Sequence, residues 1–70
     1  MSDANFLQQL GQNIRLIRSK HNITQNELAN RCNFAKASMS RIEAGKINVS
    51  VLTLKKISRS LETEMSEFFK

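Results

Sequence analysis

The 70-residue sequence contains no proline, tryptophan or tyrosine, only two glycines and a single cysteine. That cysteine, Cys32, cannot form an internal disulfide and has no second cysteine with which to hold a metal ion. No apolar run approaches the roughly 18 residues that a membrane-spanning helix needs, and the first residues lack the pattern of a secretory signal. We therefore expect a cytoplasmic protein with no metal, no other cofactor, no small-molecule ligand and no membrane partner.

Groups for catalysis are equally scarce. The only histidine, His21, has no second metal ligand at a usable spacing, and its position suits the end of a helix. The sequence offers no pairing of a nucleophile with a base, and no pair of carboxylates for acid–base chemistry. We therefore expect that the protein is not an enzyme.

Acidic residues are rare in the middle of the chain. The net charge is +5, and the sequence pI is about 10.0. Ten basic residues lie between positions 15 and 59, where the only acids are Glu27 and Glu43. A basic middle with acidic ends favours a polyanionic partner, and double-stranded DNA is the obvious one. On charge alone, a solvated basic surface without a partner remains an alternative.

Apolar residues recur at helical spacing, and no segment alternates apolar and polar residues over the length of a strand. The pattern predicts one all-α domain over residues 1–70, a compact bundle of four to five short helices. The first helix should end at His21-Asn22, where Asn22 tolerates the left-handed conformation. The expected helices cover residues 3–20, 25–31, 35–44, 51–61 and 64–69.

Two of these helices are joined by a tight turn. Thr24 precedes the second helix and Glu27 follows three residues later, which is the spacing of a capping box. Asn33 is the best left-handed residue in the turn between the second and third helices, and Gly45 suits the end of the third. Two short helices around one left-handed residue predict a helix-turn-helix over residues 24–43.

Three stretches of the sequence share one register with a known family. The first is Ile23-Thr24-Gln25-x-x-Leu28-Ala29, the second is Ser38-Met39-Ser40-Arg41-Ile42-Glu43-x-Gly45-Lys46, and the third is Leu54-x-x-Ile57-x-x-x-Leu61. With the closing Met65-Ser66-Glu67-Phe68-Phe69, they resemble the phage repressor/Cro/Xre type of helix-turn-helix domain. The resemblance covers about four-fifths of the chain, residues 14–69. It implies a lambda-repressor-like fold, in a restriction–modification controller protein or a small phage-type repressor.

The third helix carries the residues expected to read bases. Because Met39 and Ile42 should point inward, the outward side chains are those of Lys36, Ala37, Ser40 and Arg41. Lysine and arginine can donate to guanine, and an alanine methyl can meet a thymine methyl. We expect these four residues to face the major groove; the alternative is that the two cations are only solvated surface charges.

The resemblance implies further roles around this helix. It makes Gln25 a phosphate contact, assisted by the positive end of a helix dipole, and it pairs Arg18 with Glu43 as a structural ion pair. We expect the DNA phosphates to be held by Thr24, Gln25, Ser38, Lys46 and Asn48.

The sequence departs from the family pattern at several places. Ala35 stands where a capping hydroxyl is usual, and an alanine cannot cap a helix. Ala44 stands where asparagine is common, which removes one usual phosphate contact, and Val49 replaces a frequent proline. These departures leave the expected fold unchanged and bear on the list of DNA contacts.

The fourth helix suggests a second copy as a partner. If Val51 and Leu54 face the core, Leu52 should be exposed. The family more often has a polar residue at this position. We expect a homodimer whose interface includes Leu52, Met65 and Phe69. The predicted function is a sequence-specific transcriptional regulator that binds a near-palindromic operator as this dimer. The alternative is an antitoxin that binds a toxin protein as well as its own operator.

Overall fold

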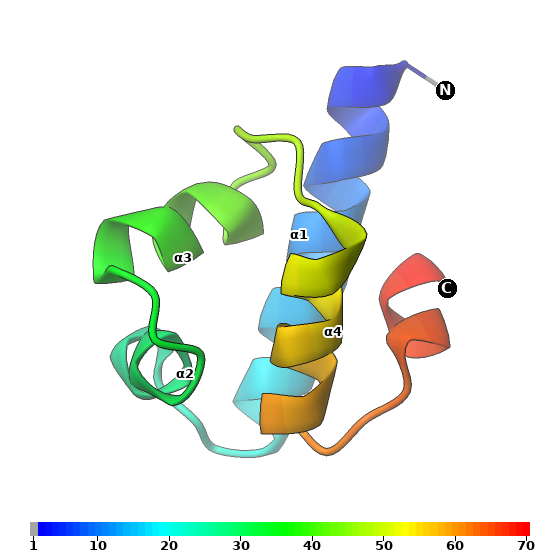
Figure 1. The fold of residues 1–70 in the computed structure, drawn as a ribbon. Helices are drawn as coiled ribbons and strands as arrows, with labels where there is room; N and C mark the ends of the chain where they lie inside the picture. The colour runs from blue at the N-terminus through cyan, green and yellow to red at the C-terminus, as the bar shows by residue number, and fades with distance from the viewer. Residues whose placement is uncertain (1) are drawn as a thin grey trace.

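The structure is a computed structural model that describes residues 2–70, so Met1 of the predicted domain lies outside the described residues. In order along the chain, the elements are α1 (Asp3–Lys20), α2 (Gln25–Arg31), α3 (Lys36–Glu43), α4 (Val51–Ser60) and the 3-10 helix η1 (Met65–Phe69). Figure 1 shows α1 and α4 through the middle of the molecule, with α2 and α3 on one side and η1 on the other. The predicted all-α fold is confirmed, and no strand occurs in the described part of the chain.

Side-chain caps define most of the helix starts. The Thr24 hydroxyl accepts from the Glu27 N–H at 3.1 Å, and the Glu27 carboxylate accepts from the Thr24 N–H at 3.2 Å. This is the predicted capping box at the start of α2. The helix α3 is shorter than predicted, because Ala35 and Ala44 are its flanking residues and not part of it.

Four described residues adopt the left-handed backbone conformation that lets helices end. Asn22, Asn33 and Gly45, with φ values of 57°, 58° and 72°, are the residues that the sequence indicated. The fourth, Glu62 with φ 53°, follows α4 and was not predicted. Glutamate is not favoured in this region, so the sequence gives no local signal for the turn.

The core lies where the inner faces of the four α-helices and η1 meet. Its fully buried centre includes Ile14, Leu28, Met39, Ile57, Leu61 and Phe68. One expectation is wrong: Val51 does not face the core and is 70% exposed. Val49 packs against the core from the preceding loop instead, which leaves Val51 outside at the first turn of α4.

Both glycines lie where α1 meets the end of α3. A Cβ added to Gly11 would lie 2.4 Å from the Glu43 carbonyl oxygen, and a Cβ at Gly45 would lie 2.6 Å from the Gln8 backbone. The backbones therefore approach too closely for any side chain at position 11. This contact fixes the position of α3 against the long helix α1.

Candidate nucleic-acid interface

The outward face of α3 carries the four residues expected to read bases. Met39 is fully buried and Ile42 is 4% exposed, so these two side chains hold α3 against the core. The face turned to solvent consists of exposed residues, namely Lys36, Ala37, Ser40 and Arg41. The helix thus presents two cations, a hydroxyl and a methyl group on one free surface.

Arg18 and Glu43 tie α1 to the end of α3. The Arg18 guanidinium donates from Nε to Glu43 Oε2 at 2.7 Å and from Nη2 to Glu43 Oε1 at 2.9 Å. It also donates to the Ile23 carbonyl oxygen at 2.9 Å. The two side chains are only 12% and 3% exposed, so the ion pair is largely removed from water. A two-point contact of this kind fixes orientation as well as distance.

Gln25 joins the same network, which the sequence did not reveal. Its side-chain amide donates to Glu43 Oε1 at 3.1 Å, so α1, α2 and α3 meet at a single carboxylate. This bond uses one amide hydrogen of Gln25 and leaves the second hydrogen and the carbonyl oxygen for another partner. Gln25 is half-buried and lies in the first turn of α2.

The capping box beside Gln25 is also an electrostatic feature. The Thr24 backbone N–H and hydroxyl bind the Glu27 carboxylate and hold its pKa below the ordinary value. Glu27 is therefore ionised at neutral pH. The Thr24 N–H and hydroxyl are therefore both engaged with Glu27, and the exposed Thr24 directly precedes Gln25 at the start of α2.

The loop after α3 supplies the remaining expected contacts. Lys46 and Asn48 are exposed, and the Lys46 N–H donates to the Arg41 carbonyl oxygen at 2.9 Å, which turns the chain away from α3. Asn48 and the half-buried Ser38 line the same cavity of about 320 Å³. The loop therefore lies beside Ser38 and Ile42 of α3, whereas Gln25 lies beside Ser40 and Glu43.

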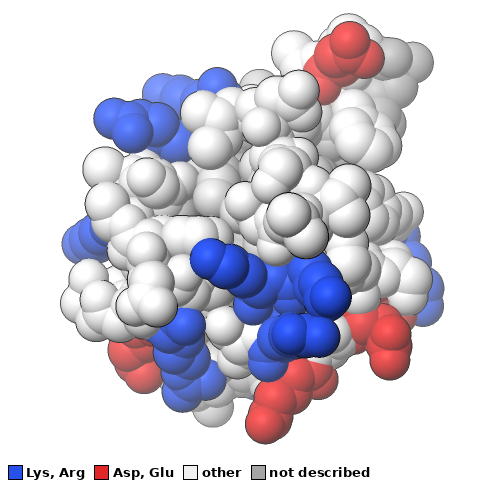
Figure 2. Space-filling model, in the orientation of Figure 1, with Lys and Arg blue, Asp and Glu red and all other residues white. Residues whose placement is uncertain are grey.

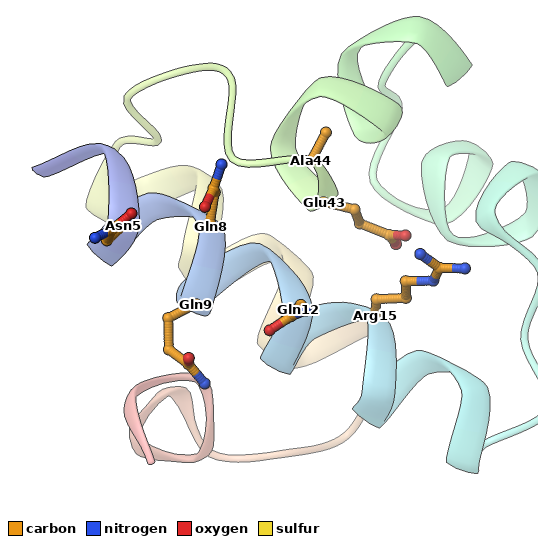
Figure 3. A pocket seen from close by; sticks show the side chains of 7 residues that line it. All are labelled: Asn5, Gln8, Gln9, Gln12, Arg15, Glu43 and Ala44. Carbon is orange, nitrogen blue, oxygen red and sulfur yellow. The ribbon is translucent and has the colours of Figure 1, made fainter.

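Arg15 is a candidate contact that the sequence reasoning missed. It lines a cavity of about 350 Å³ together with Arg18, Gln25, Ser40, Glu43 and Ala44. A neighbouring cavity of about 430 Å³ contains Arg15 as well and extends along α1 (Figure 3). The only signal in the sequence was the basic charge of the segment, which does not identify the face on which each cation lies.

Basic side chains are not confined to the helix-turn-helix. Figure 2 shows lysine and arginine gathered over the lower half of α4 as well as along the edge formed by α2 and α3. The exposed cations of α4 are Lys55, Lys56 and Arg59, and Lys56 lies 5.7 Å from the centre of the Phe34 ring. The positive field is therefore broader than the surface of α3.

The residues expected at a dimer interface differ in exposure. Leu52 is 72% exposed and Phe69 is 51% exposed, whereas Met65 is half-buried against the core. Phe69 stacks on Phe6, which is 48% exposed, with ring centres 6.2 Å apart. Phe6 also lines an apolar cavity with Val49, so exposed apolar surface runs from η1 across the start of α1 to the loop before α4.

Within residues 2–70, no three His, Cys, Asp or Glu side chains lie together as a metal site would require. In the same part of the chain, none of the helices has both the length and the apolar character to cross a bilayer.

Comparison with known proteins gives consistent matches. Residues 14–68 match the model of the helix-turn-helix family HTH_3. The chain is 41% identical over 61 residues to the HTH-type transcriptional regulator SlrR of Bacillus subtilis; the match covers 86% of this chain but only 40% of that protein. The restriction-modification controller protein C.AhdI from Aeromonas hydrophila superposes with a TM-score of 0.87 at 28% identity, covering 90% of this chain and 96% of that one. An HTH_3 family transcriptional regulator from Vibrio cholerae superposes with a TM-score of 0.88 at 28% identity, covering 97% and 38%.

Proposed function

The chain belongs to the helix-turn-helix family HTH_3, a family of DNA-binding transcription regulators and not an enzyme class, and from this we propose that it is a sequence-specific regulator that inserts α3 into the major groove. The observation that carries the proposal is the outward face of α3. Its four exposed side chains lie on a helix held rigidly from behind by Met39 and Ile42. A helix of this kind is what the major groove admits.

The side chains of that face suit different bases. Arg41 can donate two parallel hydrogen bonds to guanine O6 and N7, and Lys36 can donate to the same acceptors. The methyl group of Ala37 fits against a thymine methyl, and the Ser40 hydroxyl can donate or accept. We assign base reading to these four residues.

Phosphates on either side of the groove would hold α3 in register. Gln25 and Thr24 lie at the N-terminus of α2, where free N–H groups and the helix dipole favour an anion. Ser38, Lys46 and Asn48 lie toward the loop and suit the opposite strand. Contacts of this type supply most of the salt-dependent affinity and little of the sequence preference.

The length of α3 favours a two-fold arrangement on DNA. At eight residues, α3 is about 12 Å long and reads only a short stretch of one groove. A homodimer would place two copies of α3 about one DNA turn apart, ~34 Å, on a near-palindromic operator. Leu52 and Phe69, which are exposed apolar residues, are the proposed centre of the interface, with Met65 behind them.

Among the roles of such regulators, we favour a restriction–modification controller protein. The support is the similarity to C.AhdI, which superposes with a TM-score of 0.87 at 28% identity. The neighbouring genes would test the assignment, since a controller protein should be encoded beside a methyltransferase and an endonuclease.

The experiment that tests the function is selection of bound duplexes from random DNA at a stated salt concentration. We expect one enriched, near-palindromic sequence. Lys36→Ala and Arg41→Ala should each change the preferred bases and cost about 1–3 kcal/mol of discrimination at the affected position. Gln25→Ala should weaken all sequences about equally. If neither α3 variant changes the preference, α3 is not the reading helix.

A further inference from the structure

One face of α1 forms a polar stripe beside α3. Asn5, Gln8, Gln12 and Arg15 follow one another at intervals of three and four residues, so their side chains share one face of the helix. Gly11 lies between this stripe and the apolar stripe of α1, and its backbone touches the end of α3. The polar stripe therefore passes the C-terminal end of α3, where Glu43 and Ala44 lie, as Figure 3 shows.

The stripe and the end of α3 line an open groove. The first part is the cavity of about 430 Å³, and Ala44 forms part of its wall with only a methyl group, which leaves it open (Figure 3). The second part, of about 350 Å³, shares Arg15, Glu43 and Ala44 with the first and adds Gln25 and Ser40. Because the two parts meet at Arg15, the groove leads from the α1 stripe to the outward face of α3.

The charges in this groove favour an anion. The ion pairs of residues 2–70 are Arg18–Glu43 and Glu67–Lys70, so the exposed guanidinium of Arg15 has no acidic partner there. The one acid in the wall is Glu43, and both of its oxygens already accept hydrogen bonds from Arg18 and Gln25. The other polar lining groups are largely side-chain amides, which can donate to phosphate oxygens.

Resting on the proposed function, we propose that this groove is a further binding site for the phosphodiester backbone of DNA. The strand held at Gln25 continues over Arg15, whose guanidinium pairs with a phosphate, and the Gln12 and Gln8 amides donate to the same stretch of backbone. Duplex DNA fits better than a small anion because the groove is open along its length and joins the α3 face at Ser40. The helix α1 is then a second DNA-binding element beside the helix-turn-helix.

The test is Arg15→Gln, compared on the selected operator and on a scrambled duplex over a range of salt. For each bound copy, we expect the affinity for both duplexes to fall about 5–10-fold near 0.1 M salt, and the slope of log K against log salt to decrease by about 0.9. The base preference and melting temperature should not change. Arg59→Gln is the matched control, because it removes an exposed arginine from α4, outside the groove. It should change the salt slope much less.

A neutral methylphosphonate placed at single positions of the operator locates the contact. At the phosphate that Arg15 binds, the methylphosphonate should lower the affinity of the wild-type protein as much as Arg15→Gln does. It should not lower the affinity of the variant further. If the two changes are additive at every phosphate, Arg15 does not contact the backbone. If inorganic phosphate raises the melting temperature through Arg15 while the DNA salt slope of Arg15→Gln is unchanged, the groove binds a free anion and the proposal is wrong.

The outcome also separates this inference from the proposed function. If Arg15→Gln and Arg59→Gln behave alike while Arg41→Ala still changes the base preference, the groove is not a DNA site and the regulator remains. If the wild-type protein binds no duplex, the proposed function fails and the groove proposal fails with it.

Discussion

At the scale of single residues, Glu43 connects the three helices that carry most of the proposed DNA contacts. Its carboxylate binds Arg18 of α1 and Gln25 of α2 while its backbone carbonyl touches Gly11. The side chain is only 3% exposed, so its negative charge is stabilised by these partners and not by water. Glu43 is therefore the residue at which α1, α2 and α3 are held together.

Removing Arg18 should therefore act through folding. Arg18→Ala leaves the buried Glu43 charge without its main partner, and breaking a buried pair from one side costs about 3–5 kcal/mol. A domain of this size has only roughly 4–10 kcal/mol of stability in total. We expect a large fall in melting temperature by circular dichroism, with DNA binding lost in proportion to the unfolded fraction.

A paired variant provides the control for Arg18. Replacing both partners, with Arg18→Met and Glu43→Leu, removes the buried charges together and should recover a large part of the lost stability. If Arg18→Ala keeps its melting temperature and still loses DNA binding, then Arg18 is a direct phosphate contact and the structural assignment is wrong.

Gly11 makes a second residue-scale prediction, because two effects act there in opposite directions. Alanine is favoured over glycine inside a helix by about 1 kcal/mol. In this structure, however, the added Cβ would lie 2.4 Å from a backbone oxygen of α3, and backbone atoms cannot move aside as a side chain can. We expect Gly11→Ala to lower stability by about 1–3 kcal/mol, as overpacking does. Ser19→Ala, at an exposed site of α1, should leave the melting temperature unchanged or raise it.

At the scale of helices and turns, the start of α3 is the weak point. Ala35 occupies the cap position with an extended backbone at φ −65° and ψ 145°, but no side chain caps the helix. Ala35→Ser should supply the missing acceptor and raise stability by about 1 kcal/mol, equivalent to roughly 4–8 °C in melting temperature for a domain of this size. Thermal unfolding of Ala35→Ser and Ala35→Val, which cannot cap, would check this; equal melting temperatures would show that α3 needs no cap.

Local sequence signals predicted the helix-turn-helix because each one acts over a few residues. The Thr24–Glu27 capping box, the left-handed Asn33 and the terminal Gly45 all lie where the sequence placed them. Features that depend on packing were missed. Val49 packs against the core while Val51 is exposed, and Arg15 lines a groove beside the contact between α1 and α3 at Gly11.

At the scale of the whole molecule, a dimer contact would occupy a substantial share of the surface. The molecule measures 30 × 22 × 20 Å and exposes 4691 Å². A stable dimer commonly buries about 800 Å² on each partner, roughly a sixth of this surface. The exposed apolar residues at the start of α4 and around Phe6 and Phe69 provide a surface of the right chemistry for that contact.

The dimer can be tested by sedimentation at high micromolar protein concentration, with and without operator DNA. We expect the wild-type protein to sediment as a dimer. Leu52→Glu should shift it to a monomer, because the substitution places a charge in the interface once from each copy. Hot-spot losses of about 2 kcal/mol at each side would raise the dissociation constant roughly 1000-fold.

The same variants connect the dimer to DNA recognition. Leu52→Glu should lose affinity for the full operator but bind an isolated half-site as well as the wild-type protein does, because α3 and its phosphate contacts are untouched. Asn30→Glu adds the same charge on exposed α2 and should still sediment as a dimer in the absence of DNA. A wild-type protein that stays monomeric both free and on DNA would show that this surface does not join two copies, and that each α3 reads its site independently.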